Sequence, residues 1–98
     1  MKLVPIGYFN FVNLDRIISI AIPDSAPMKR LIREAQDNRM LIDATCGRKT
    51  RAVISMDSGH VVLSAFDPRT INARIFGKIT SLDDDLPEDL EEGMEYDK

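Results

Sequence analysis

Three short runs of β-branched and apolar residues dictate that this chain builds a sheet. They are RIISIAI (16–22), RAVISM (51–56) and HVVLSAF (60–66). The first run has isoleucines on both of its faces, which predicts a strand covered on both sides. The DSG sequence at 57–59 separates the other two runs, and Gly59 suits the positive φ of a hairpin loop. These two runs are therefore expected to pair as antiparallel strands.

Two further segments are expected to be extended. LVPI (3–6) predicts a first strand, and LIDAT (41–45) predicts a short strand later in the chain. Between LVPI and RIISIAI, the segment GYFNFVN (7–13) is expected to continue the first strand irregularly, with Gly7 marking a bend or a bulge.

One long helix is predicted between the strands at 16–22 and 41–45. From Met28 to Ala35 the apolar residues recur with the i, i+3, i+4, i+7 spacing of a single buried stripe. Asp24 or Ser25 can cap this helix, and Pro27 fits its first turn, where no intrahelical N–H donor is needed.

A second helix is predicted near the end of the folded part. Asp67 can cap it, Pro68 can occupy its first position, and Gly77 can end it. Together these elements predict an α+β fold with a mostly antiparallel β-sheet and about two helices packed on it.

The charge of the chain is divided very unevenly. Residues 1–79 contain 12 Lys and Arg against 7 Asp and Glu, whereas residues 80–98 contain nine acids and only Lys98 as a cation. We therefore expect a basic folded domain over 1–79 and an acidic, disordered tail over 80–98. The tail can serve solubility, or it can compete with an anionic partner for the cations of the domain.

The residues that usually support catalysis or metal binding are scarce. Cys46 and His60 are the only cysteine and the only histidine, and the sequence has no glycine-rich phosphate loop and no HExxH or CxxC spacing. No enzymatic activity, cofactor or metal is therefore expected. The N-terminus lacks a signal-peptide pattern and no apolar run approaches the length of a membrane span, so a cytoplasmic protein without membrane contact is expected.

The sequence GRKTR (47–51) is the clearest candidate for a binding site. It puts Arg48, Lys49 and Arg51 immediately before an apolar strand, so a loop can project cations while the strand anchors its base. A solvated loop, with Arg51 turned inward to pair with an acid such as Asp43, is the alternative.

Three long stretches of the chain are distinctive together: IGYFNFVNLDRIISIAIPDSAPMKRLI (6–32), LIDATCGRKTRAVI (41–54) and DSGHVVLSAFDPRTINARI (57–75). They resemble the RemA family, the extracellular matrix regulatory protein A group of small bacterial regulators. The similarity covers nearly all of residues 3–76 and includes SAPMKRLI and DAT-x-GR-x-TRAVI in the family's order.

This resemblance implies a bacterial transcriptional regulator that binds double-stranded DNA, acts on biofilm matrix operons and is associated with the nucleoid. It implies a LytTR-like fold and a homo-oligomeric ring of about seven or eight subunits with a belt of cations around which DNA bends. The DNA-binding residues of the family correspond to Arg48, Lys49 and Arg16, and Pro27 corresponds to a proline at a subunit contact. No cofactor or metal belongs to this scheme.

The chain departs from the family at several of these positions. Lys49 stands where a second arginine is usual, which keeps the charge but loses the planar fork that can bind through two hydrogen bonds. Phe9 replaces a common glycine, and Cys46 replaces an aromatic residue or a histidine. Asp15 puts a negative charge beside Arg16, whose alternative role is a surface ion pair with Asp15 or Asp43.

Other binding functions remain open from the sequence. A non-catalytic assembly protein would form the ring without binding a polyanion. A protein that binds RNA or single strands would normally expose aromatic residues beside its cations. Tyr8, Phe9 and Phe11 lie elsewhere in the sequence, where the core could hold them.

Overall fold

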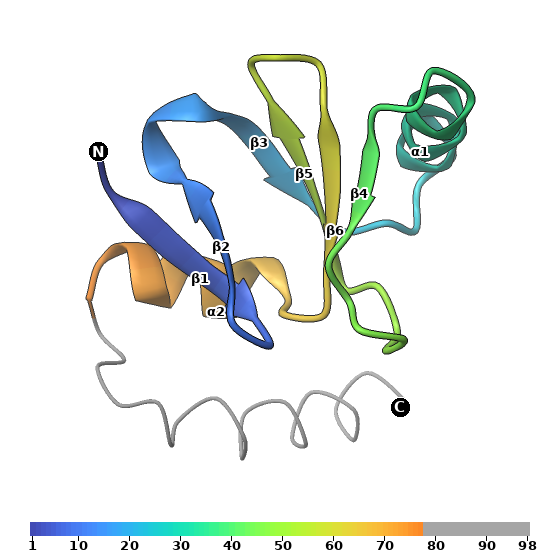
Figure 1. Cartoon of the computed structure of the whole chain (residues 1–98). Coiled ribbons are helices and arrows are strands. Elements are labelled where there is room, and N and C mark those ends of the chain that lie inside the picture. The colour runs from blue at the N-terminus through green and yellow to red at the C-terminus, as the bar shows by residue number, and fades with distance from the viewer. Residues whose placement is uncertain (78–98) are drawn as a thin grey trace.

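The computed structural model describes residues 1–77, which form two helices, a 3₁₀ turn and six strands (Figure 1). In chain order they are β1 (Leu3–Gly7), β2 (Asn10–Asn13), η1 (Leu14–Arg16), β3 (Ile17–Ala21), α1 (Ala26–Asp37), β4 (Leu41–Asp43), β5 (Ala52–Met56), β6 (Val61–Ser64) and α2 (Pro68–Ile75). The predicted α+β class and the two helices are confirmed. The predicted tail, residues 80–98, lies outside the described residues.

Four strands form the main sheet in the order β3-β5-β6-β4. β5 pairs antiparallel with both β3 and β6, as the DSG turn predicted for β5 and β6. β4 instead pairs parallel with β6, because α1 carries the chain across the sheet before β4 begins. Although mostly antiparallel, the sheet is therefore mixed, with β3 and β4 at its two edges.

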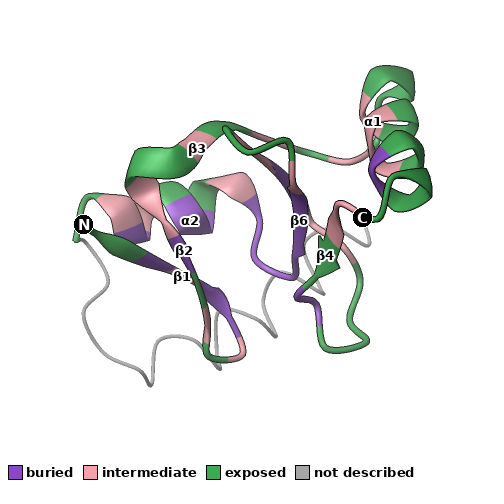
Figure 2. Ribbon diagram, turned by 45° about the horizontal axis from the view of Figure 1, so that its top comes forward, coloured by how far each residue is buried: buried purple, intermediate pink, exposed green. Residues whose placement is uncertain are grey.

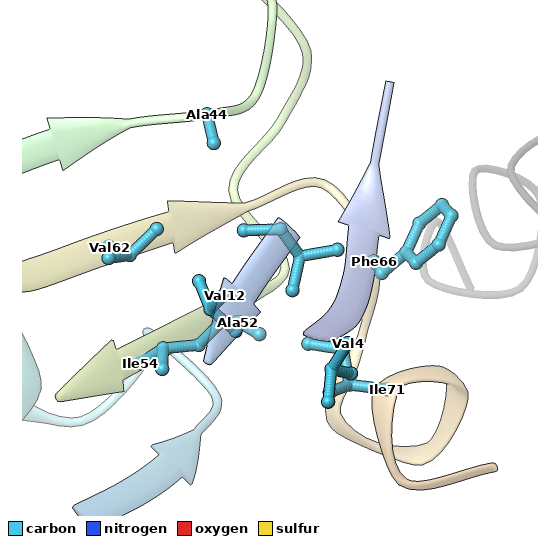
Figure 3. Packing of buried hydrophobic residues seen from close by; sticks show 9 residues of the cluster. Val4, Val12, Ala44, Ala52, Ile54, Val62, Phe66 and Ile71 are labelled. Atoms are coloured by element: carbon cyan, nitrogen blue, oxygen red, sulfur yellow. The ribbon is translucent and has the colours of Figure 1, made fainter. Parts of the chain in front are cut away.

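The two faces of the sheet are covered by different parts of the chain (Figures 1 and 2). Alternate residues of a strand point to opposite faces, so Ile54 and Val62 lie on one face while Val53 and Val61 lie on the other. On the first face β1, β2 and α2 complete a buried cluster, shown in Figure 3: Val4, Ile6, Val12, Ala44, Ala52, Ile54, Val62, Phe66 and Ile71. On the second face α1 packs with its predicted apolar stripe, Met28, Leu31, Ile32 and Ala35.

Both helices begin as their sequences predict. Ser25 caps α1 by accepting a hydrogen bond from the N–H of Met28, at 3.3 Å. Asp67 caps α2 by accepting one from the N–H of Thr70, at 2.8 Å, and a proline occupies the first turn of each helix. Gly77 follows α2 with a φ of +72°.

Two predictions for the N-terminal part are wrong. The segment 7–13 is not a continuation of β1 but turns at Tyr8 and Phe9 and returns as β2, antiparallel to β1. The strand at 16–22 is not covered on both sides, because β3 is an edge strand and α1 packs over β4 and β6. Ile18 and Ile22 remain 67% and 53% exposed.

Candidate nucleic-acid interface

Residues 44–51, here called the basic loop, connect β4 to β5 and carry the predicted cations. The loop begins with a local hydrogen-bonded turn, in which Asp43 Oδ1 accepts from the N–H of Thr45 at 3.0 Å and from its hydroxyl at 2.6 Å. These two donors lower the pKa of the Asp43 carboxyl, with the side-chain hydrogen bond the larger cause. Cys46 and Gly47 then adopt positive φ values of 54° and 81° and reverse the chain.

Both ends of the basic loop are hydrogen-bonded to the buried strand β6 and its C-terminal end. The N–H of Ala44 donates to the carbonyl of Leu63 at 3.0 Å, and the N–H of Arg51 donates to that of Ser64 at 2.8 Å. Between these two anchors, Arg48 and Lys49 are exposed. Arg51, which forms the second anchor, is less exposed than they are. The loop therefore projects two cations from a fixed base, as the sequence predicted.

The tip of the β1–β2 hairpin lies beside the basic loop, at the same end of the molecule in both views (Figures 1 and 2). The guanidinium carbon of Arg48 lies 5.2 Å from the centre of the Tyr8 ring, within the range of a cation–π contact. The side-chain amide of Asn10 donates to the carbonyl of Ala44 at 3.3 Å and to that of Gly7 at 3.0 Å. The hairpin thus supports the loop and orients one of its cations.

The hairpin aromatics are the residues that the sequence analysis missed. Tyr8 is half-buried beneath Arg48, and Phe9 is 82% exposed at the tip, so neither belongs to the core. The two segments are about forty residues apart in the sequence, and no local pattern indicates that they meet. One aromatic ring, that of Tyr8, therefore contacts a cation of the basic loop, and the next residue, Phe9, is exposed rather than in the core, contrary to the sequence expectation.

Arg16 lies at the opposite end of the sheet. The register of β3 and β5 pairs Ile17 with Met56, which puts Arg16 beside the β5–β6 turn. There Arg16 forms an ion pair with Asp57 at 3.2 Å, rather than with Asp15 or Asp43 as the sequence suggested. Since a strand advances about 3.3 Å per residue, Arg16 and Arg51 are separated by roughly 20 Å, and one chain does not bring them together.

A small hollow lies between the basic loop and the segment that follows β3. Asp24, Lys49 and Arg51 line this hollow with three neighbours, Ile22, Pro23 and Thr50. Pro27 follows in the first turn of α1, where it is exposed. The carboxylate of Asp43, the acid that the sequence offered to Arg51, accepts its hydrogen bonds from Thr45.

His60, which the sequence offered as a rare catalytic residue type, has a structural role in the described region. His60 Nδ1 shares a 2.7 Å hydrogen bond with the Ser58 hydroxyl inside the β5–β6 turn, which is a structural contact. Within residues 1–77, no group of three His, Cys, Asp or Glu side chains could hold a metal ion. The helices of this same region are not long and apolar enough to cross a membrane.

Comparison with known proteins places the chain among bacterial regulators. The model of the family described as RemA-like, extracellular matrix regulatory protein A-like, matches residues 3–75. A protein of Brevibacillus brevis is 54% identical over 88 residues, which cover 90% of this chain and 98% of that protein. One of Halalkalibacterium halodurans is 58% identical over 78 residues, covering 80% of this chain and 90% of that protein. Both are named as putative regulatory proteins. The match over nearly the whole described region, together with these identities, means that the chain belongs to the RemA-like family of regulatory proteins.

Proposed function

We propose that this regulatory protein binds double-stranded DNA and controls transcription, with Arg48 and Lys49 as its phosphate contacts. The observation that carries the proposal is the exposure of both cations on a loop whose two ends are hydrogen-bonded to a buried strand. Such a loop loses little conformational entropy when it binds, because its backbone is already ordered. Lys49 suits contact with phosphate better than base reading, since its ammonium group is a point charge.

The DNA-binding form is a homo-oligomeric ring of about seven or eight LytTR-like subunits. A single chain offers few phosphate contacts, whereas bending a site of 20–30 base pairs costs on the order of 1 to 6 kcal/mol. A ring repeats the basic loop and so supplies enough contacts to offset that cost. The exposed Ile18 on the edge strand β3 and Ile22 directly after it favour contact with another copy, and Pro27 at the start of α1 shapes the segment that follows.

Arg16 and Arg51 take part as secondary contacts in this scheme. Arg16 would exchange the Asp57 carboxylate for a phosphate, and assembly would bring it near the basic loop of another subunit. Biofilm matrix operons are the proposed targets, with the protein associated with the nucleoid.

The test is duplex binding over a salt series, for the wild type and for Arg48→Ala/Lys49→Ala. Each neutralised phosphate contributes about −0.9 to the slope of log affinity against log salt. The double variant is expected to lose affinity and to flatten the slope by about 1.8 for each subunit that contacts DNA. Light scattering must show that both proteins keep the same oligomeric state.

Arg30→Ala/Arg33→Ala is the matched control, because it removes two exposed cations from α1 and changes the net charge equally. It should lower affinity much less than the loop variant. Equal losses for the two variants would mean that net charge alone drives binding, and an unchanged slope for the loop variant would remove Arg48 and Lys49 from the interface.

A second candidate function is binding of single-stranded nucleic acid. It is favoured by Tyr8, whose ring contacts Arg48, and by the exposed Phe9 that follows it, because bases stack on aromatic side chains next to cations. Comparing duplex DNA, single-stranded DNA and RNA at equal salt separates the two functions. A wide margin for single strands would overturn the duplex proposal, and a ring that binds none of the three would indicate an assembly protein.

A further inference from the structure

The turn that joins β1 to β2 is built from residues that do not favour its backbone conformation. Tyr8 and Phe9 have φ values of 56° and 64°, the left-handed region that glycine and asparagine adopt most readily. Aromatic residues at both positions cost free energy that a glycine would avoid. For Tyr8 the structure supplies a compensating contact, the stacking of Arg48 on its ring.

Within residues 1–77 no comparable contact compensates Phe9. Its side chain, at the tip of the hairpin, is 82% exposed. Strained backbone positions cluster at functional sites, which makes this exposed ring a candidate contact for a ligand.

The surroundings of Phe9 identify the chemistry of that partner. Tyr8, the preceding residue, contacts Arg48, and Asn10, the following residue, donates a hydrogen bond to the first carbonyl of the basic loop. A polyanion attracted by Arg48 and Lys49 would therefore approach the hairpin tip that carries Phe9. In duplex DNA the apolar surface beside the phosphates is the stack of bases, and an aromatic side chain can enter it between two base pairs.

We infer that Phe9 is a wedge that inserts between neighbouring base pairs of the duplex held by the basic loop. This inference rests on the proposed function and adds to it a fixed position for the bend. Insertion partly unstacks one base step and kinks the duplex. The bent duplex then follows more of the protein surface, which brings more phosphates to the basic loops of the assembly. Pyrimidine–purine steps such as TA unstack most easily, so the wedge also supplies sequence preference without any hydrogen bond to a base.

The experiment uses two otherwise identical duplexes, with a TA step or a GC step at the centre, and 2-aminopurine as the adenine analogue that becomes fluorescent when unstacked. The wild type is expected to bind the TA duplex more tightly and to raise its fluorescence. Phe9→Gly should keep the fold, because glycine suits a positive φ, and should keep the salt slope. It is expected to lose the fluorescence rise and to reduce the TA preference by about fivefold or more.

Two further variants sharpen the result. Phe9→Leu keeps an apolar wedge and should retain part of the fluorescence rise, which a purely structural role of the aromatic ring would not predict. Phe76→Ala removes another exposed aromatic side chain, 70% exposed at the end of α2, and should leave both readouts unchanged.

Several results would overturn the wedge. An unchanged fluorescence rise and TA preference in Phe9→Gly would exclude insertion while leaving the basic-loop contact intact. Smaller particles in light scattering would assign Phe9 to a contact between subunits. A loss confined to single-stranded DNA would assign it to base stacking on open strands. If the wild type binds no duplex, both the wedge and the proposed function fail.

Discussion

Replacing Ser64 by alanine should destabilise the protein strongly, because this small side chain joins two parts of the fold. Its hydroxyl donates to the carbonyl of Ile6 at 2.8 Å and accepts from the N–H of Phe66 at 3.0 Å, in a fully buried setting. Alanine leaves both backbone groups without a partner, and each such group costs roughly 1 to 3 kcal/mol. We expect a combined loss of about 2 to 4 kcal/mol, since small backbone shifts recover part of the cost.

That loss is large for a domain of this size. At about 0.05 to 0.15 kcal/mol per residue, the described region has a total stability of only roughly 4 to 12 kcal/mol. A change of 1 kcal/mol moves the melting temperature of a small domain by about 4 to 8 °C, so Ser64→Ala should lower it by roughly 8 to 30 °C. The assay is thermal unfolding followed by circular dichroism at one fixed protein concentration, because assembly would raise the apparent stability.

Ser19→Ala is the matched control for this prediction. Ser19 also forms a hydrogen bond, with the hydroxyl of Ser55, but on the exposed part of the β3–β5 pair. Its loss should change stability by no more than about 0.5 kcal/mol. A melting temperature for Ser64→Ala within about 3 °C of the wild type would refute the reasoning that the two buried hydrogen bonds, one to β1 and one to Phe66, stabilise this part of the fold.

Three further changes test the supports of the fold and of the basic loop. Gly7→Ala would put a Cβ atom 3.1 Å from the Phe66 ring at a φ of +106°, and should cost about 1 to 3 kcal/mol in urea unfolding. Asp67→Ala removes the cap on the Thr70 N–H and should cost about 1 to 2 kcal/mol in the same assay, with Asp67→Asn losing less; equal losses would contradict the capping role. Asp43 has a lowered pKa, so its contribution to stability is complete above its ordinary value of 3.8 and is lost as the pH falls through the lower folded value. The stability difference between wild type and Asp43→Ala, measured by unfolding at each pH, should therefore shrink below about pH 4, and a constant difference would contradict it.

The helices were predictable because their signals are local. Ser25 and Asp67 each accept a hydrogen bond from the N–H three residues later and so cap a helix. A proline in the first turn of each helix also favours helix initiation there. The β5–β6 hairpin was predictable for the same reason. Whether the strand at 16–22 is covered on both sides depends on the position of α1, which a local pattern does not give. In the structure α1 packs over β4 and β6 instead.

The candidate interface was predictable in part. The cations of GRKTR and their projection from the mouth of a strand follow from neighbouring residues. The contact of Tyr8 with Arg48, and the position of Arg16 at the far end of the sheet, depend on strand pairings between distant segments. Nothing local encodes such pairings, so the exposure of Phe9 at a hairpin that contacts the basic loop emerged only from the structure.

The joining of the two ends of the described region has a consequence for synthesis on the ribosome. The ammonium group of Lys2 donates to the carbonyl of Ile75, 73 residues later, and α2 packs against β1. A nascent chain that stops short of residue 75 therefore leaves the apolar side of Val4 and Ile6 without its cover. Until α2 leaves the ribosome, this surface is open to chaperones and to aggregation, so native folding has to wait for nearly the whole described region.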